Sequence, residues 1–259
     1  MDRTLIVSTR RYGAAGPLVL LMPSLGRGAV DFDDLGERLG AAGYRAQAVN
    51  PRGVARTSAL PAAESLHDYA ADLAALIALA GTGPAHVIGH AFGNRVVRCL
   101  ASESPELVQS VTLLACGGQV EPDDEARNAL FRCFEPGLPE AELMEAVRTA
   151  FFAPGNDPSV WRQGWWPAAA RAEAAAVRAT DPATWRHAGR APLLIVQGLQ
   201  DRVAPPENGR LLKRELGDRV TLVEIEGAGH ALLPEQPAAI AEAVLSFLAR
   251  PRPGEGKPA

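Results

Sequence analysis

The sequence lacks the features that mark several classes of protein. Of its 259 residues only three are cysteines (Cys99, Cys116 and Cys133), and this odd number forms no disulfide framework and is typical of a reducing compartment. The formal net charge of −4 gives no electrostatic reason to expect a nucleic-acid partner. No apolar run approaches the length of a membrane span, and the N-terminal stretch MDRTLIVSTRRYG has too short an apolar run for a signal peptide. We therefore expect a soluble cytoplasmic protein without a membrane partner.

Motifs for metals and nucleotide cofactors are also missing. Histidine, cysteine and acidic residues do not recur at the spacing of metal ligands, and no glycine-rich phosphate loop carries a lysine. The stretch GTGPAHVIG at 81–89 is rich in glycine, but it ends a helix and enters a strand, which is the reverse order of a phosphate loop. No dinucleotide fingerprint is followed by an acidic residue. We expect neither a metal nor a cofactor.

What the chain has instead is a series of short apolar runs that alternate with longer helical patterns. This alternation is typical of an α/β protein with a mostly parallel, doubly wound sheet and helices on both faces. The length allows one large α/β domain or two small ones. The expected strands are Leu5–Ser8, Leu18–Met22, Tyr44–Val49, His86–Ile88, Ser110–Leu114, Leu193–Gln197 and Val220–Ile225.

Three further segments are assigned from their patterns. Ser65 is expected to cap a helix with Leu66, Tyr69 and Leu73 on one face, and Pro234–Leu248 is expected to be the closing helix. The proline- and glycine-rich end, 251–259, is expected to be a disordered tail.

Residues 121–189 break the alternation, because they carry helical patterns and no convincing strand. All four tryptophans lie there, together with Phe131, Phe134, Phe151 and Phe152. A small helical cap over a pocket needs aromatic packing of its own, and it can also present aromatic side chains to a ligand. For any single ring, packing within the cap is the favoured interpretation.

One short stretch, VIGHAFGNRVV at 87–97, bears directly on mechanism. A strand end, a turn bracketed by Gly89 and Gly93, and a helical pattern form the setting in which Gly-x-Ser-x-Gly presents a serine nucleophile. Here the central residue is Ala91, whose methyl group cannot attack a substrate.

With this turn, three other stretches make the chain resemble the α/β-hydrolase superfamily over nearly its whole length. NPRGVARTS is similar to the family's turn after the fourth strand, GLQDRVAP to its acid loop, and GAGHALLPEQP to its histidine loop. The resemblance implies a core made of 1–120 and 190–250, with 121–189 as a helical cap inserted before the strand that leads to the acid loop. It also implies Asp201 as the acid and His230 as the base of a catalytic site.

The chemistry of these two residues supports the pairing. A carboxylate that accepts a hydrogen bond from one imidazole nitrogen fixes the tautomer and stabilises the imidazolium. Both residues follow strands, at the rim where open α/β sheets bind ligands. The alternatives are a solvated turn carboxylate for Asp201 and a loop histidine bonded to backbone for His230; the other histidines are expected to be structural or solvated. We expect Asp201 and His230 to be in contact and to face a pocket under the cap.

The stretch LMPSLGRG departs from the family pattern as well. Pro23 and Ser24 stand where the family usually has His-Gly. The resemblance implies an oxyanion hole made by the backbone N–H groups of Leu25 and Phe92, which do not depend on side chains. Two departures on both sides of one pocket favour natural divergence over an engineered Ser-to-Ala change at Ala91.

Several functions stay open. The leading hypothesis is an enzyme that acts on a small, largely apolar carbonyl or ester-type substrate, with His230 and Asp201 as a general-base dyad. The base could activate water or remove a proton, since relatives with this fold include lyases and cofactor-free oxygenases. A serine esterase inactivated at Ala91 and a non-catalytic ligand-binding or scaffold protein are alternatives. In a further alternative Ser24 replaces the nucleophile, but we expect its hydroxyl to bond within its own loop. Cys116 is expected to be a small buried hydrophobe.

Overall fold

In the part of the chain that the structure describes, seven strands form a mixed sheet in the order β1-β3-β2-β4-β5-β6-β7. The computed structural model describes residues 7–250, apart from the side chains of residues 58 and 59. β1 runs antiparallel to β3, and every other neighbouring pair is parallel. The strands are β1 (Thr9–Tyr12), β2 (Leu18–Met22), β3 (Arg45–Val49), β4 (Ala85–His90), β5 (Val108–Leu114), β6 (Leu193–Gly198) and β7 (Val220–Ile225).

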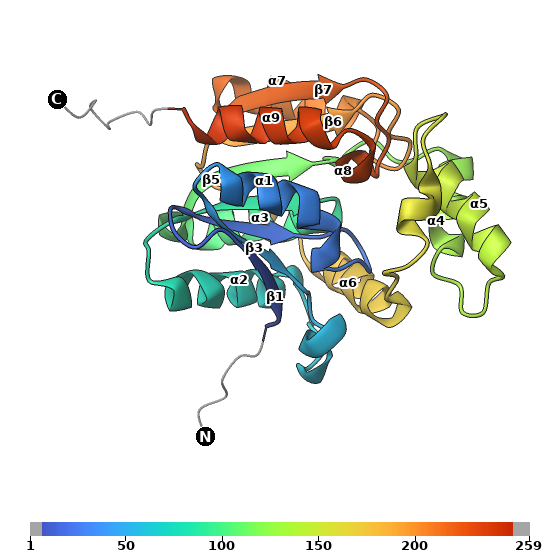
Figure 1. Ribbon diagram of the computed structural model, residues 1–259, viewed down its shortest axis with the longest axis horizontal. Helices are drawn as coiled ribbons and strands as arrows, with labels where there is room; N and C mark the ends of the chain where they lie inside the picture. The colour runs from blue at the N-terminus through green and yellow to red at the C-terminus, as the bar shows by residue number, and fades with distance from the viewer. Residues whose placement is uncertain (1–6, 251–259) are drawn as a thin grey trace.

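Helices cover both faces of this sheet. The helices are α1 (Asp33–Ala41), α2 (Leu66–Ala80), α3 (Phe92–Glu103), α4 (Asp124–Arg132), α5 (Glu140–Phe151), α6 (Pro167–Ala179), α7 (Glu207–Leu216), α8 (Leu232–Glu235) and α9 (Pro237–Leu248). α1 and α9 pack together against one face, and α2, α3 and α7 cover the other (Figure 1). The architecture is therefore the doubly wound α/β sheet that the sequence predicts.

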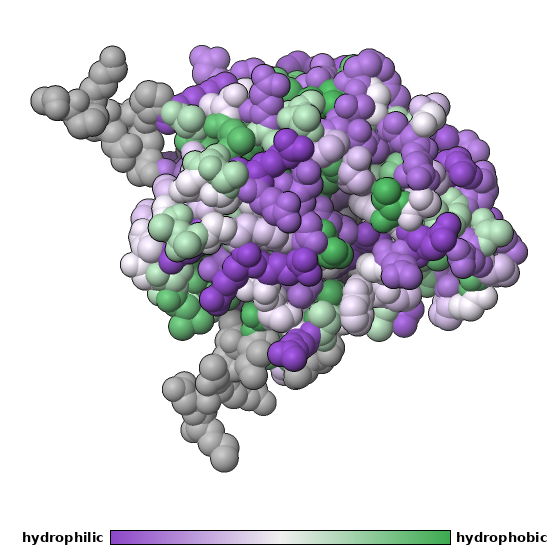
Figure 2. Space-filling view, in the orientation of Figure 1, coloured by the Kyte–Doolittle hydropathy of each residue, from purple (hydrophilic) through white to green (hydrophobic). Residues whose placement is uncertain are grey.

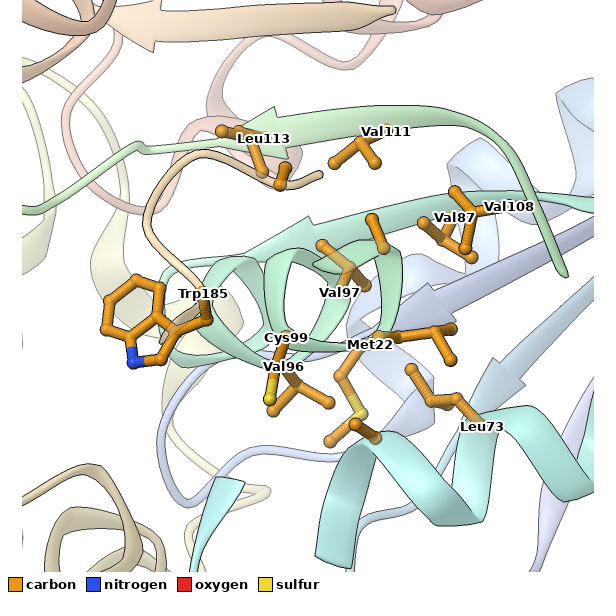
Figure 3. Packing of buried hydrophobic residues seen from close by; sticks show 14 of the residues in the cluster. Met22, Leu73, Val87, Val96, Val97, Cys99, Val108, Val111, Leu113 and Trp185 are labelled. Carbon is orange, nitrogen blue, oxygen red and sulfur yellow. The ribbon is translucent and has the colours of Figure 1, made fainter. Parts of the chain in front are cut away.

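Side chains that alternate between the two faces of each strand form two hydrophobic clusters, one on each side of the sheet. In β6, Leu193 and Ile195 belong to the cluster under α2 and α3, whereas Leu194 and Val196 belong to the cluster under α1 and α9. Successive side chains of a strand point to opposite faces, so a strand covered on both faces must be apolar throughout. Figure 3 shows members of the first cluster, among them Val97 of α3. On the outer face seen in Figure 2, hydrophilic residues predominate and hydrophobic residues form small separate patches.

The expected first strand and closing helix are wrong in their bounds. Val7 and Ser8 precede β1, and Leu5 and Ile6 lie outside the described residues. The apolar run was a poor guide because β1 is an edge strand whose sequence, TRRY, is half exposed. The closing helix is divided in two, since α8 ends at Glu235 and Pro237 begins α9, where a missing N–H costs nothing. Ser65 caps α2 as expected, with a capping box to Asp68. The tail at 251–259 lies outside the described residues.

The helices between β5 and β6 pack in two different places. α4 and α5 lie beyond the carboxyl ends of the strands, past the arrowheads in Figure 1. α6 lies beside α2, and Ala176, Trp185 and Ala188 belong to the core cluster of the sheet. Within 121–189, the part that projects over the strand ends is therefore α4, α5 and the short helix Pro158–Trp161. None of the helices in the described part of the chain is both long and apolar enough to cross a membrane.

Candidate active site

The turn after β4 has the geometry of a strained elbow. Ala91 adopts φ 49° and ψ −103°, a region that residues other than glycine rarely occupy, and α3 begins at Phe92. A Cβ on Gly93 would lie 2.1 Å from the carbonyl oxygen of Met22, and one on Gly89 would lie 2.3 Å from the carbonyl carbon of Gly93. Both glycines are therefore required by close contact, and the alanine between them is held at the tip of the turn.

The loop after β2 lies beside this elbow. Because the strand order changes direction between β2 and β4, the two strand ends form a switch point, where open α/β sheets bind ligands. The N–H of Gly93 donates to the carbonyl oxygen of Pro23 at 3.1 Å. The N–H of Leu25 has no hydrogen-bond partner among the described residues, and that of Phe92 begins a helix, where it has no helical partner. Two free backbone donors thus lie on neighbouring loops.

Asp201 and His230 are in direct contact. Asp201 follows β6, His230 follows β7, and the Nδ1 of the imidazole lies 3.0 and 3.1 Å from the two carboxylate oxygens. The carboxylate also accepts from the N–H groups of Val203 and Ala204 and from the amide of Gln197. Both side chains are buried. A carboxylate cannot donate, so Nδ1 carries the proton of this hydrogen bond, and in the neutral form of the ring the lone pair is on Nε2.

His90 supports this arrangement, although its sequence context singled it out only weakly. Its Nε2 donates to the backbone carbonyl of His230 at 2.8 Å, and its ring lies 5.4 Å from the His230 ring. Burial, and then the neighbouring His230, lower the pKa of His90 to about 3. His90 therefore stays neutral near pH 7 and anchors the backbone of His230. Because the partners are 140 residues apart, no local pattern could have indicated this role.

A cavity of about 440 Å³ opens in front of these residues. His230, Ala91, Ser24 and Leu25 are part of its floor. Its other walls are largely aromatic and come from the segment between β5 and β6; these lining residues include Phe131, Phe134, Phe151, Trp161 and Trp165. Phe151 and Trp161 also belong to a separate apolar cluster with α4 and α5, so these rings both pack the segment and face the cavity. A partly open, largely apolar cavity of this size suits a small ligand.

Two contacts that sequence reasoning missed join the aromatic wall to the loops of the site. The guanidinium of Arg27 lies 4.4 Å from the Trp161 ring and 4.7 Å from the Trp165 ring, and it pairs with Asp31 at 2.7 Å. The carboxylate of Glu235, in α8, accepts from the N–H of Gly229 and from that of Ala153. Both contacts fix the position of the aromatic segment between β5 and β6 relative to the loops after β2 and β7.

Ser24 departs from the expectation for its hydroxyl. Its side chain is buried and lines the cavity, and its Oγ forms no hydrogen bond with its own loop or with His230 among the described residues. The hydroxyl is therefore free to meet a ligand. Cys116 is buried and is not part of the lining of this cavity, and burial raises the pKa of its thiol, which is the behaviour of a small hydrophobe.

One group of side chains in the described part of the chain could hold a metal ion. His67, Cys99 and Glu103 bring one ligand atom each within 4.8 Å of the others, on α2 and α3 and away from the cavity. Burial, and then Glu103, raise the pKa of the Cys99 thiol well above its usual range. The thiolate that a metal needs is thus disfavoured, and this group is best explained as a hydrogen-bonded surface cluster.

The chain matches a hydrolase family in sequence and is similar in fold to several solved structures. A family described as "Alpha/beta hydrolase family" matches residues 18–243. The protein named "Putative carbamate hydrolase RutD" of Variovorax paradoxus is 28% identical over 258 residues, which cover 92% of this chain and 93% of that protein. The solved structure of a hydrolase from Pseudomonas aeruginosa PA01 superposes with a TM-score of 0.79 at 23% identity, covering 96% of this chain and 100% of that one. The structure of the "Putative non-heme bromoperoxidase BpoC" from Mycobacterium tuberculosis superposes with a TM-score of 0.78 at 24% identity, covering 96% of this chain and 98% of that one. At these identities the two structures support the fold alone.

Proposed function

Since this chain belongs to the alpha/beta hydrolase family, we propose that it hydrolyses a small, largely apolar carbonyl or ester-type compound without a nucleophilic serine. His230, oriented by Asp201, is the general base. The attacking group is a water molecule in the space beside Ala91, and the N–H groups of Leu25 and Phe92 stabilise the oxyanion. In this proposal 121–189 serves as the cap that encloses the substrate.

The observation that carries the proposal is the hydrogen bond between Asp201 and His230 at the edge of an apolar cavity. Nε2 takes a proton from water, the resulting hydroxide attacks the carbonyl carbon, and the imidazolium returns the proton to the leaving group. The carboxylate stabilises that imidazolium while it exists. Because losing a triad serine costs on the order of 10⁶ in turnover in a serine protease, the substrate must be a reactive one, such as an activated ester or a lactone.

The test is turnover of a panel of small esters, lactones, carbamates and diketones, with products identified by mass spectrometry. Carbamates are included because one relative is named as a carbamate hydrolase. For any substrate found, Asp201→Asn should lower kcat by about 10²–10⁴-fold and leave KM nearly unchanged, because only the tautomer and the imidazolium are affected. Full turnover by both Asp201→Asn and His230→Gln would contradict the proposal.

The same panel separates the non-hydrolytic alternatives. Hydrolysis in ¹⁸O-labelled water places one labelled oxygen in the product, whereas proton removal followed by rearrangement or elimination places none. A ligand that binds without any turnover would favour the non-catalytic alternative.

A second candidate mechanism uses Ser24 as the nucleophile. It is favoured by one observation, that Ser24 lines the cavity with His230 and its hydroxyl has no hydrogen-bond partner among the described residues. A covalent adduct on Ser24, together with complete loss of turnover in Ser24→Ala, would establish this mechanism in place of direct attack by water. Our proposal requires that Ser24→Ala keep most of its turnover.

A further inference from the structure

Positive charge gathers around the cavity although the chain as a whole carries −4. Arg27, Arg95 and Arg178 line the cavity, and Glu121 is the acidic residue among its lining. Arg27 is neutralised by Asp31, with which it forms a buried ion pair. The other two arginines have no ion pair with a carboxylate in the described residues, so the cavity wall is more positive than the surrounding protein.

Arg95 is the more significant of the two because of its position. It lies on α3 four residues after Ala91, which places its backbone about 6 Å further along the helix. It lines the main cavity and also a neighbouring cavity of about 180 Å³. Its guanidinium forms no hydrogen bond with another described residue. The carboxylate that acts on it electrostatically is that of Glu121, whose side chain is 78% exposed and lies near Arg127.

A second arginine without a carboxylate partner, Arg98, lies three residues further along α3. The side chain of Arg98 is only 2% exposed and lines the smaller cavity. Its guanidinium donates to the carbonyl oxygens of Asn94, Gly117 and Arg186 and lies over the Trp185 ring, so all its partners are neutral. Burial lowers the pKa of each arginine, and Arg98 lowers that of Arg95 further.

The half-buried guanidinium of Arg95 and the buried one of Arg98 have no carboxylate at ion-pair distance. This arrangement is costly, because a charge removed from water is stabilised chiefly by an opposite charge. A bound anion would supply that charge, and a planar carboxylate matches the fork of N–H donors on Arg95. The apolar walls of the cavity exclude a large polar ligand and favour a carboxylate joined to an apolar body.

We propose that Arg95, with Arg98 three residues further along α3, is a subsite for the carboxylate of an acidic substrate. The substrate class is an apolar carboxylic acid whose reacting carbonyl lies a few carbon atoms from the carboxylate, so that the carbonyl reaches the space beside Ala91 and His230. The placement of the reacting carbonyl rests on the proposed function, whereas the preference for an acid does not.

The test is calorimetric titration of the whole protein with 3-phenylpropionate and with its neutral counterpart 3-phenylpropan-1-ol. The acid should bind at least about tenfold more tightly, since a charge-assisted pair in a desolvated site exceeds 1.4 kcal/mol. Arg95→Gln should abolish the difference and leave the affinity for the alcohol unchanged, and Arg95→Lys should keep part of it. Arg171→Gln, which removes the same charge from α6 at a position outside the cavity lining, should change nothing.

Several outcomes would overturn the subsite. Equal affinity of the wild type for acid and alcohol, no binding of either probe, or an acid preference that survives in Arg95→Gln would each do so. If the acid preference were lost in Arg178→Gln and kept in Arg95→Gln, the carboxylate would bind at the exposed rim of the cavity and not at Arg95. If Arg95→Gln fails to fold, Arg95→Lys is the deciding variant, because the subsite requires that its affinity for the acid, and not for the alcohol, be measurably lower.

The experiment needs no turnover, and His230→Gln should keep the preference for the acid. A protein that prefers the acid but hydrolyses no substrate would therefore refute the proposed function and leave the subsite standing.

Discussion

The carboxylate of Glu173, in the middle of α6, accepts a hydrogen bond of 2.7 Å from the backbone N–H of Gly26. This contact joins residues 147 positions apart and fixes the loop that follows Leu25, a residue of the cavity lining. Glu173 is fully buried, and its second oxygen has no partner in the described structure. Burial raises the pKa of Glu173 to about 8, against the opposing effect of the Gly26 hydrogen bond.

We expect this group to make stability depend on pH. Between its ordinary pKa of about 4.5 and its raised value of about 8, the folded chain keeps a proton that the unfolded chain has lost. The contribution of Glu173 to the free energy of unfolding is therefore fully present below pH 4.5, falls as pH rises to 8, and is constant above that. Glu173→Gln cannot lose a proton, so relative to the wild type it should gain about 2 kcal/mol or more between pH 5 and pH 9.

Urea unfolding of both proteins at pH 5, 7 and 9 checks this prediction. The difference between the two is the relevant quantity, because His90, whose pKa is lowered, contributes a change of opposite sign at lower pH. A difference that stays constant with pH would show that Glu173 is ionised in the folded protein.

The elbow yields a prediction about stability. A methyl group on Gly93 would meet the backbone of Met22 and Pro23 at 2.1 to 2.9 Å, where no flexible side chain can move aside. Gly93→Ala should therefore lower the free energy of unfolding by about 3 kcal/mol or more. The matched control is Gly118→Ala, since a methyl group there has no neighbour closer than 3.8 Å and should change stability by about 0.5 kcal/mol or less. Equal stability of the two variants in urea unfolding would mean that β2 and α3 are less closely packed than described.

Local patterns in the sequence were sufficient for the inner strands of the sheet, and the resemblance to the hydrolase family for the loops that carry Asp201 and His230. β2 and β7 have the predicted bounds because their apolar runs end at turn residues, and the stretches GLQDRVAP and GAGHALLPEQP identify two loops that meet in space. The edge strand β1 could not be found from hydrophobicity, because an edge strand need not be apolar.

The supporting residues could not be found for a different reason. His90 and Arg95 lie in the stretch VIGHAFGNRVV, but neither is a defining residue of that turn, and Glu173 lies in no motif. The importance of all three comes from charges and partners supplied by distant segments. Such roles depend on burial and on tertiary contacts, which composition and periodicity do not encode.

The final prediction concerns the residue at the tip of the elbow. Ala91 has the positive φ of a strained turn, lines the cavity with His230 and Leu25, and directly precedes Phe92, the first residue of α3. Ala91→Ser adds one oxygen atom at the cavity, where packing strain should be about 1 kcal/mol or less. A hydroxyl there needs only a base and an oxyanion hole to attack an activated ester, so this variant, unlike the parent, should react with a fluorophosphonate probe and slowly cleave short p-nitrophenyl esters. Turnover should be weak, because Pro23 and Ser24 replace the family's usual His-Gly in the loop that contains Leu25.

The double variant Ala91→Ser with His230→Gln is the control and should take up no probe, since its serine lacks a base. If Ala91→Ser is well folded and still takes up no probe over hours at mildly alkaline pH, the site is not arranged for a serine nucleophile, and the non-hydrolytic or non-catalytic alternatives gain support.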